Sequence, residues 1–493
     1  MTVHRFPAGR IVRPRRRVAG GLSVALASLV LAACGGRQER AEVALEMDVP
    51  EAFALLPASE RQPVAEDSAL DEAWCSDFGD PALGEVVAAV VGANLDLRVA
   101  WTRVREADAL VAQVRSQGRP RVSAEASAGR GNALVPGPGG ASLQTQNSFG
   151  LGATAAWEVD LWGRVGAQVR AAESDREALA LDVRALEMAV SARAAEAYLE
   201  GVRVEEERRL LSEQLRVSGQ FAALVEARFR VGQATALDVL QQRQNVEELE
   251  SRAVGLDLEA HLARLALARL MGLAEPAEGL TLARALPAAP RGRLEVLPAE
   301  LLERRPDVAA ARERAVAADH RVEAALRERL PRLRLSANLA LQATSIGELF
   351  DYLFWSVGSG LTQSIWEGGR VRAEVERQEA VLERALLGYV QALLGAIHEV
   401  QEGLARVAAR ERVLHELEGQ LALATTALEA ARTRYRGGDV DFLRVLTAQQ
   451  AVQRLEVGLL EARRSLLLGQ VDLCRVAGGI PRPAEDETEG DEP

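Results

Sequence analysis

The sequence predicts a mixed α and β membrane protein built from two copies of one unit, with long helices and strands of membrane-spanning length. Three observations support this fold class. The stretch Arg228–Leu240 recurs in altered form at Arg434–Leu446, a constant 206 residues later. Four segments alternate apolar and polar residues with the period of two that strands show. Two long proline-free stretches of helical periodicity follow them, one in each copy.

The duplication covers most of the chain, and it defines the architecture before any local prediction is made. Gly272 corresponds to Gly478 with the offset of 206, whereas Asp96 corresponds to Asp307 with an offset of 211. The first copy therefore carries five extra residues between Pro120 and Gly163. The predicted organisation is a signal peptide (1–33), a lipid-anchored tether (34–79), a first repeat (80–272), an inter-repeat linker (273–300), a second repeat (301–478) and an acidic disordered tail (479–493).

Composition excludes several classes of function. Aromatic residues make up only 4% of the 493 residues and alanine is abundant, which suits closely packed helices. The formal charge is −12, and it becomes −18 without the six arginines of the leader, so a nucleic-acid partner is not expected. No nucleophile elbow, phosphate loop or Cys-x-x-Cys motif is present. We expect no enzyme, no cofactor and no metal site, because the histidines after the leader lack ligand spacing: His261, His320, His398 and His415.

The first 33 residues are interpreted as a secretory signal. A basic segment, Arg5–Arg17, precedes an apolar run, Val18–Leu31, that is too short to span a bilayer. The following Leu-Ala-Ala-Cys34 resembles a bacterial lipobox, in which the cysteine is acylated and becomes the N-terminus. Gly35 after it favours the outer membrane. We expect Cys34 to carry lipid; the alternative is a plain signal peptide with an incidental cysteine.

The alternating segments predict strands at about 121–130, 147–158, 332–344 and 354–366. Each has about the ten residues that a tilted membrane-spanning strand needs. The alternative is two amphipathic hairpins packed on a core. The small polar face opposite the apolar one would make a poor core, and tryptophans at the strand ends predict a membrane-interface belt: Trp157, Trp162, Trp355 and Trp366.

Four strands cannot close into a barrel, and an open sheet edge in lipid leaves backbone groups unpaired at a cost of several kcal/mol each. Strands from several chains must therefore combine. Two chains would give eight strands, a barrel that side chains fill, whereas three chains give twelve strands and room for water. A homotrimer is the smallest assembly that conducts.

The proline-free stretches predict helices over Arg164–Arg230 and Arg370–Arg436, each about 100 Å long. Glycines then reverse the chain, at Gly232 in the first copy and at Gly437 and Gly438 in the second. Shorter helices of about 35 residues follow, and together with the helices before the hairpins they would line each long helix. A plain coiled coil is the alternative, but it leaves the strands unexplained.

Several motifs, in order and duplicated, carry a family resemblance over nearly the whole mature chain. They are the Cys34 lipobox, Asp80–Leu83, Asn94–Leu97, Trp157–Arg164, Leu301–Asp307, Trp366–Arg370 and the glycine turns. Together they resemble the outer-membrane factors of tripartite efflux systems, the TolC/OprM family, and in particular its lipoprotein branch of NodT-type RND efflux proteins. The resemblance implies a trimer with a 12-stranded β-barrel in the outer membrane and a long α-helical barrel in the periplasm. It also implies a periplasmic adaptor and an inner-membrane RND-type transporter as partners, and small molecules as cargo.

In that family, the turns after the long helices constrict the pore at the periplasmic tip. Here Asp238 and Arg444 occupy equivalent positions there, which predicts ion pairs across adjacent hairpins in a ring of six. The alternative is that they are two unrelated solvated charges on helix surfaces. Phe442 and Leu443 are candidate apolar plugs, and Tyr435 matches a family gate tyrosine. The inherited gate is incomplete, because two positions where relatives place an acid or an arginine hold other residues: Val440 and Thr447.

Some alternatives stay open at this point. Cys75 and Cys474 form a disulfide or are two buried small apolar residues. The same kind of conduit serves type I protein secretion, and a periplasmic helical scaffold without a pore is a further alternative. Detergent extraction would distinguish the scaffold, because only a barrel protein needs detergent once its lipid is removed.

Overall fold

The computed structural model of the chain describes residues 78–137, 140–276, 282–289 and 305–478. All of them belong to one compact unit. The predictions made for the signal peptide, Cys34, Cys75, almost all of the tether and the acidic tail lie outside the described residues, as does more than half of the inter-repeat linker.

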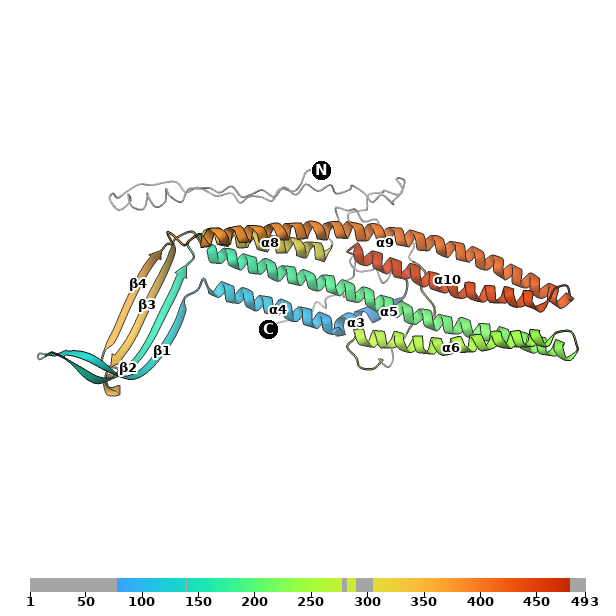
Figure 1. Ribbon diagram of the computed structural model, residues 1–493, viewed down its shortest axis with the longest axis horizontal. Helices are drawn as coiled ribbons and strands as arrows, with labels where there is room; N and C mark the ends of the chain where they lie inside the picture. The colour runs from blue at the N-terminus through green and yellow to red at the C-terminus, as the bar shows by residue number, and fades with distance from the viewer. Residues whose placement is uncertain (1–77, 138–139, 277–281, 290–304, 479–493) are drawn as a thin grey trace, which may run out of the picture. The chain divides into compact units, whose positions relative to one another are not determined.

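Two long helices dominate the described residues (Figure 1). They are α5, Arg164–Arg230, and α9, Arg370–Gly437, with 67 and 68 residues. The range predicted for α5 is confirmed, and α9 is one residue longer than predicted. Neither helix contains proline, which would remove a backbone donor and break the helix.

Shorter helices lie along the long ones (Figure 1). In the first repeat, α3 (Pro81–Ala93), α4 (Leu95–Ser116) and α6 (Ala236–Leu270) pack on α5. In the second repeat, α8 (Pro306–Arg327) and α10 (Phe442–Val476) pack on α9. Helices α8 and α10 also pack on α5, so the two repeats are joined along this helix. The predicted stacking of short helices along each long one is confirmed.

The starts of the short helices follow from local capping. The Asp80 carboxylate accepts a hydrogen bond from Ala82 N at 3.1 Å, and Pro81 occupies the first helical position of α3. Asn94 caps α4 by accepting from Leu97 N at 3.1 Å. Its side-chain amide also donates to Leu270 O at 2.8 Å, which ties the start of α4 to the end of α6.

The sheet is a four-stranded antiparallel meander in the order β1-β2-β3-β4. Its strands are β1 (Arg121–Gly137), β2 (Gly140–Val159), β3 (Arg332–Ala343) and β4 (Leu353–Thr362). The first hairpin is much longer than predicted, because pairing continues from Arg130↔Asn147 to Gly137↔Gly140. The segment between β3 and β4 includes a short 3₁₀ turn at Ile346–Glu348. Strand β4 ends at Thr362, so the prediction that it reaches residue 366 was wrong.

The register places the predicted apolar residues on one continuous face. Ala155 of β2 pairs with Val122 of β1 and with Ala337 of β3, which in turn pairs with Val357 of β4. Val122 and Val357 are both 75% exposed, and every residue of β4 is exposed. Within one chain, no other part of the residues that the structure describes forms a layer over this apolar face.

The largest buried cluster lies where α3 and the end of α6 pack on the middle of α5. At its centre Tyr198 is fully buried, and its hydroxyl donates to Asp80 Oδ2 at 2.7 Å. Ala283 N donates to the same hydroxyl at 3.2 Å, which fixes segment 282–289 against α5. Burial, and then the hydrogen bond to Asp80, raise the pKa of Tyr198, so the phenol stays neutral.

Helix α9 contains an 18-residue stretch that is apolar and long enough to cross a membrane by composition. Only 17% of that stretch is buried in the single chain. Exposed leucines on α9, such as Leu387 and Leu423, are 56% and 75% accessible. An exposed apolar helix face of this kind is also what a subunit interface presents.

Candidate functional site: the helical tip

The tip is the end of the helical region where α5 turns into α6 and α9 turns into α10 (Figure 1). Gly232 and Gly438 adopt left-handed backbone conformations with φ of 76° and 85°, which other residues adopt only with strain. Gly437 is the last residue of α9. The two predicted glycine turns are therefore confirmed, with a single left-handed glycine in each.

Both turns lead directly into capped helices. Thr235 and Asp238 form a capping box at the start of α6: the Asp238 carboxylate accepts from Thr235 N at 2.8 Å, and Thr235 Oγ1 accepts from Asp238 N at 3.2 Å. Asp441 caps α10 by accepting from Arg444 N at 3.3 Å. Asp238 and Arg444 therefore hold equivalent positions in the first turn of α6 and α10.

The predicted Asp238–Arg444 pairing is absent inside one chain. The described residues contain no ion pair between these two side chains, and Asp238 is engaged by its own helix cap. The Arg444 side chain is exposed and the Asp238 side chain is half-buried, so both are accessible to a neighbouring copy. Pairing between chains stays a prediction.

Phe442 is not available as a plug, because it is buried in the interior of the tip. It is 2% exposed, and its ring lies 5.9 Å from that of Tyr435 and 6.5 Å from that of Phe221. This cluster joins α5, α9 and α10. The sequence missed the burial because Phe442 opens a helix beside a polar turn. Leu443, its neighbour, is 52% exposed and remains a candidate plug.

Arg228 clamps the predicted gate tyrosine. Its Cζ lies 4.5 Å from the centroid of the Tyr435 ring, which is a cation–π contact. The same guanidinium donates to Tyr435 O at 3.1 Å and to Arg436 O at 3.4 Å. Arg228 is at the end of α5 and Tyr435 at the end of α9, so the clamp holds the two long helices together at the tip.

A buried amide cluster lies further from the tip, around Ser218 of α5. The Ser218 hydroxyl accepts hydrogen bonds from Gln449 at 2.9 Å and Gln453 at 3.2 Å, both on α10. Gln242 of α6 donates to Ser218 O at 2.9 Å. Because buried polar groups are costly when unpaired, this cluster fixes the register of α5, α6 and α10.

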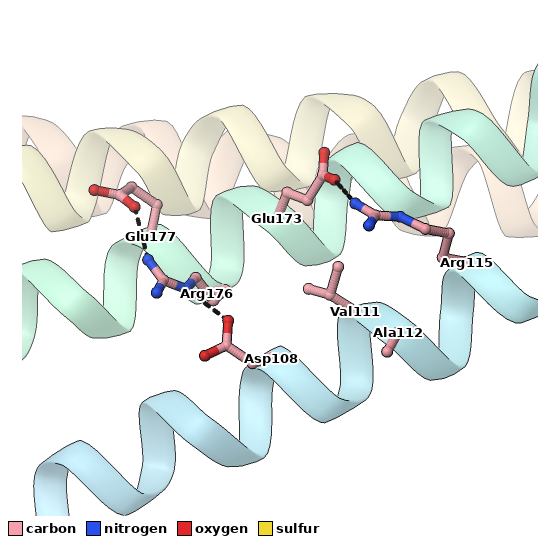
Figure 2. Close-up of a pocket in the computed structure, with 7 residues that line it drawn as sticks. All are labelled: Asp108, Val111, Ala112, Arg115, Glu173, Arg176 and Glu177. Atoms are coloured by element: carbon pink, nitrogen blue, oxygen red, sulfur yellow. Dashed lines mark hydrogen bonds and ion pairs between the residues drawn. The ribbon is translucent and has the colours of Figure 1, made fainter. Parts of the chain in front are cut away.

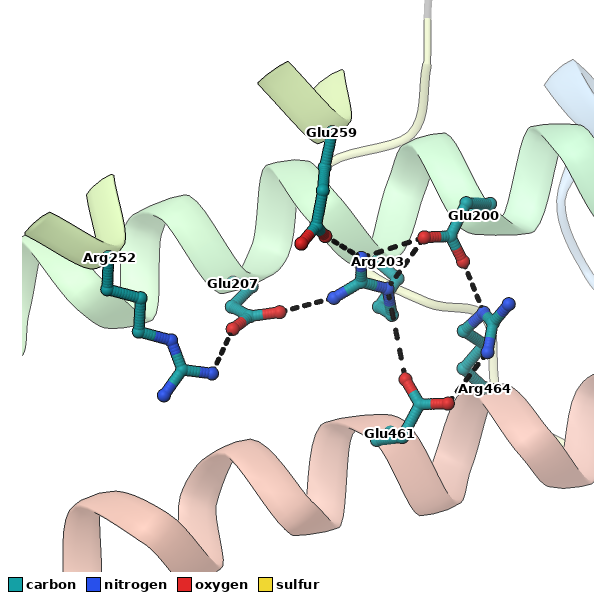
Figure 3. A network of polar contacts seen from close by, with 7 residues as sticks. All are labelled: Glu200, Arg203, Glu207, Arg252, Glu259, Glu461 and Arg464. Atoms are coloured by element: carbon teal, nitrogen blue, oxygen red, sulfur yellow. Dashed lines mark hydrogen bonds and ion pairs between the residues drawn. The ribbon is translucent and has the colours of Figure 1, made fainter. Parts of the chain in front are cut away.

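A second network centres on Arg203 of α5 (Figure 3). Its guanidinium pairs with Glu207 and Glu200 of the same helix, the latter at 2.7 Å, and with Glu259 of α6 at 2.5 Å. Glu461 of α10 lies 3.9 Å away. Burial alone would lower the pKa of Arg203, but the hydrogen bonds that it donates to Glu200 and Glu259 outweigh this effect and raise the pKa. The network binds both repeats to α5.

The groove between α4 and α5 is lined by charged side chains that pair with one another (Figure 2). Arg115 pairs with Glu173 at 2.6 Å, and Arg176 pairs with Asp108 at 2.9 Å and with Glu177 at 3.3 Å. All five charged side chains that line it therefore take part in ion pairs across or along the helices, with Arg176 shared by two carboxylates. The described residues also contain no group of three or more potential metal ligands.

The predicted belt tryptophans lie in or just beyond the strands: Trp157 in β2, Trp162 after it, Trp355 in β4 and Trp366 before α9. Trp162 donates to Pro331 O at 2.8 Å, and Trp355 pairs with Leu339. Pro331 and Leu339 are eight residues apart, about 26 Å at about 3.3 Å per residue. Because the strands of such barrels are tilted by about 35–45°, this length spans about 20 Å of membrane height, which is less than the roughly 25 Å of an outer-membrane apolar band. The belt itself stays a prediction.

A family model described as outer membrane efflux protein matches residues 88–273 and 297–479, one match in each repeat. The chain belongs to the outer membrane efflux protein family. Pyoverdine export outer membrane protein OpmQ of Pseudomonas aeruginosa is 30% identical over 469 residues, covering 93% of this chain and 96% of OpmQ. Outer membrane protein OprJ of the same organism is 30% identical over 481 residues, covering 94% of this chain and 96% of OprJ.

Solved structures agree. The outer-membrane channel OprN is 29% identical, with a TM-score of 0.77 over 88% of this chain and 98% of OprN. CusC, at 23% identity and a TM-score of 0.77, shares the fold. The predicted fold class is confirmed, because these neighbours are trimeric channels with a β-barrel and a long α-helical barrel. The protein is an outer-membrane exit duct for efflux that extends into the periplasm, and members of its family are channel and transport proteins.

Proposed function

We propose that this duct serves a tripartite pump of the RND type. A periplasmic adaptor and an inner-membrane RND-type transporter deliver small organic molecules to the helical end, and the molecules leave passively through the barrel. The sheet supports this most directly. It presents four strands with a bare apolar face and two open edges, which only assembly in lipid can satisfy.

The names of the relatives support the class of cargo. Two of them are named for pyoverdine export and toluene efflux, and both cargoes are small molecules. The lipobox supports a lipid anchor at Cys34, and acyl chains contribute about 0.8 kcal/mol per buried CH₂ group. Lipidation would hold the chain at the membrane independently of the barrel.

The test combines assembly with export. Native mass spectrometry of the detergent-purified protein should give three copies. A stable monomer with full β content would contradict assembly into a duct. Deleting the gene in its host should raise sensitivity to small organic toxins and leave secreted proteins unchanged. Loss of one secreted protein with unchanged toxin sensitivity would assign the duct to type I secretion instead.

A further inference from the structure

The repeated motif at the tip makes only one of its two possible clamps inside a chain. The first copy reads Arg228-Phe229-Arg230 and the second Arg434-Tyr435-Arg436. Arg228 of the first copy holds Tyr435 of the second, with its guanidinium over the ring and on the carbonyls of Tyr435 and Arg436. The counterpart of this contact would join Arg434 of the second copy to Phe229 of a first copy.

The clamp uses the ring and backbone of Tyr435 and does not use its hydroxyl. The Tyr435 hydroxyl is buried and has no hydrogen-bond partner among the described residues. A phenylalanine offers the same ring face and the same carbonyls to an arginine. Phe229 therefore has everything that the clamp requires, although it differs from Tyr435 by the missing hydroxyl.

The groups that would form the second clamp, Arg434 and Phe229, do not form it in the single chain. The described residues give the Arg434 side chain no hydrogen bond or ion pair, and it is exposed. Phe229 is 47% exposed, whereas Tyr435 is 6% exposed. Part of this difference comes from Phe442, which covers Tyr435 and whose counterpart is the small Ala236.

The exposed face of α6 indicates which helix packs against it in the assembly. Helix α10 packs on both α9 and α5, whereas its counterpart α6 packs mainly on α5. Leu240 and Val254 of α6 are 62% and 72% exposed, but their counterparts Leu446 and Leu460 on α10 are 6% and 5% exposed. In a ring of two-repeat chains, the second repeat of one chain is followed by the first repeat of the next. The α9 helix of a second copy therefore lies against α6.

We propose that Arg434 closes the same clamp over Phe229 of the next copy of this chain, donating to the carbonyls of Phe229 and Arg230 there. Three clamps within chains and three between chains then form one ring around the tip. This inference rests on the trimeric duct, and it specifies which residues join neighbouring subunits at its helical end.

The experiment replaces Phe229 with the photoreactive residue p-benzoylphenylalanine in the full chain and irradiates the purified trimer. The expected product is a two-chain species on a denaturing gel whose cross-linked peptide contains Arg434. The matched control places the same residue at Tyr435, where the adduct should stay within one chain on the peptide that contains Arg228. Adding Arg434→Ala to the Phe229 variant should lower the two-chain yield several-fold, and adding Arg436→Ala should leave it unchanged.

The reciprocal variant, with the photoreactive residue at position 434, reports the same contact from the other side. Adducts of position 229 within its own chain, or on a neighbouring peptide without Arg434, would overturn the clamp while native mass spectrometry still gives a trimer. A monomer in native mass spectrometry would instead contradict the duct itself, so the two failures are distinguishable.

Discussion

Replacing Arg203 with methionine should loosen the seam between the two repeats. Arg203 is 8% exposed and holds acidic side chains from α5, α6 and α10 (Figure 3). Its loss leaves Glu207, which is 4% exposed, with Arg252 as its remaining ion-pair partner. Breaking a buried pair costs about 3–5 kcal/mol. Because Arg252 still compensates, we expect about 3 kcal/mol, which is on the order of a 10²-fold change in an equilibrium.

Hydrogen exchange of the trimer in detergent measures this change locally. Amides of α5 near residue 203, and of the α6 and α10 segments that face it, should exchange about 10²-fold faster, and those of α3 should not change. The double variant Arg203→Met with Glu207→Leu should recover most of the protection, because no buried charge is left unpaired. Arg216→Met, which removes an exposed pair with Glu213, is the control and should change nothing. Exchange within about three-fold of the unmodified protein in Arg203→Met would refute the reasoning.

Three further predictions concern the ends of the molecule and its acid stability. Mass spectrometry should find Cys34 as a lipidated N-terminus, and Cys34→Ser should lower membrane retention; an unmodified N-terminus elsewhere contradicts this. Asp238→Arg or Arg444→Asp should raise resting conductance in planar bilayers and the double swap should restore it, whereas unchanged conductance in both assembled single variants rules the pairing out. Burial alone would raise the pKa of Glu200, but Arg203 and Arg464 hold it below its ordinary 4.5. A carboxylate with a depressed folded-state pKa keeps its contribution above its unfolded pKa, so heat stability followed by circular dichroism should fall only below about pH 4.5; loss already at pH 6 would contradict this.

The helical part of the fold was predictable from the sequence because its signals are local. The range of α5 is bounded by Gly163 and by the turn at Gly232, with no proline between them. The outer part of the first hairpin was missed for a physical reason. Residues between Arg130 and Asn147 lack the apolar alternation of a lipid-facing strand, but backbone pairing across a hairpin does not require it.

The contacts at the tip depend on packing between segments that are far apart in the chain. Phe442 is buried by Phe221 and Tyr435, which come from two other helices, so its sequence position beside a turn gave no sign of burial. The Arg228 clamp left a signal, because Arg-aromatic-Arg occurs at the same place in both copies. That repeat shows where the two motifs lie but does not show that the arginine of one copy holds the ring of the other.

At one position the two copies make the same hydrogen bond with different side chains. Trp157 donates to Gly118 O at 2.9 Å, and its counterpart Gln363 donates to Arg329 O, the counterpart carbonyl, at 3.5 Å. Each repeat therefore has a side-chain N–H donor at this junction of strand and helix, although the two side chains differ.

At other positions the two copies differ and the interaction is lost. These positions show how the contact between repeats inside one chain differs from the contact between chains. Arg464 of α10 pairs with Glu200 inside the chain, and its counterpart on α6 is Leu258, which is 59% exposed. The counterpart of Glu461 is Gly255, so this part of the ionic network has no equivalent on the face that meets the next copy. One chain can therefore complete its internal seam with charges before it assembles. The seam between chains instead buries apolar surface, and this surface stays exposed to water until a second copy covers it.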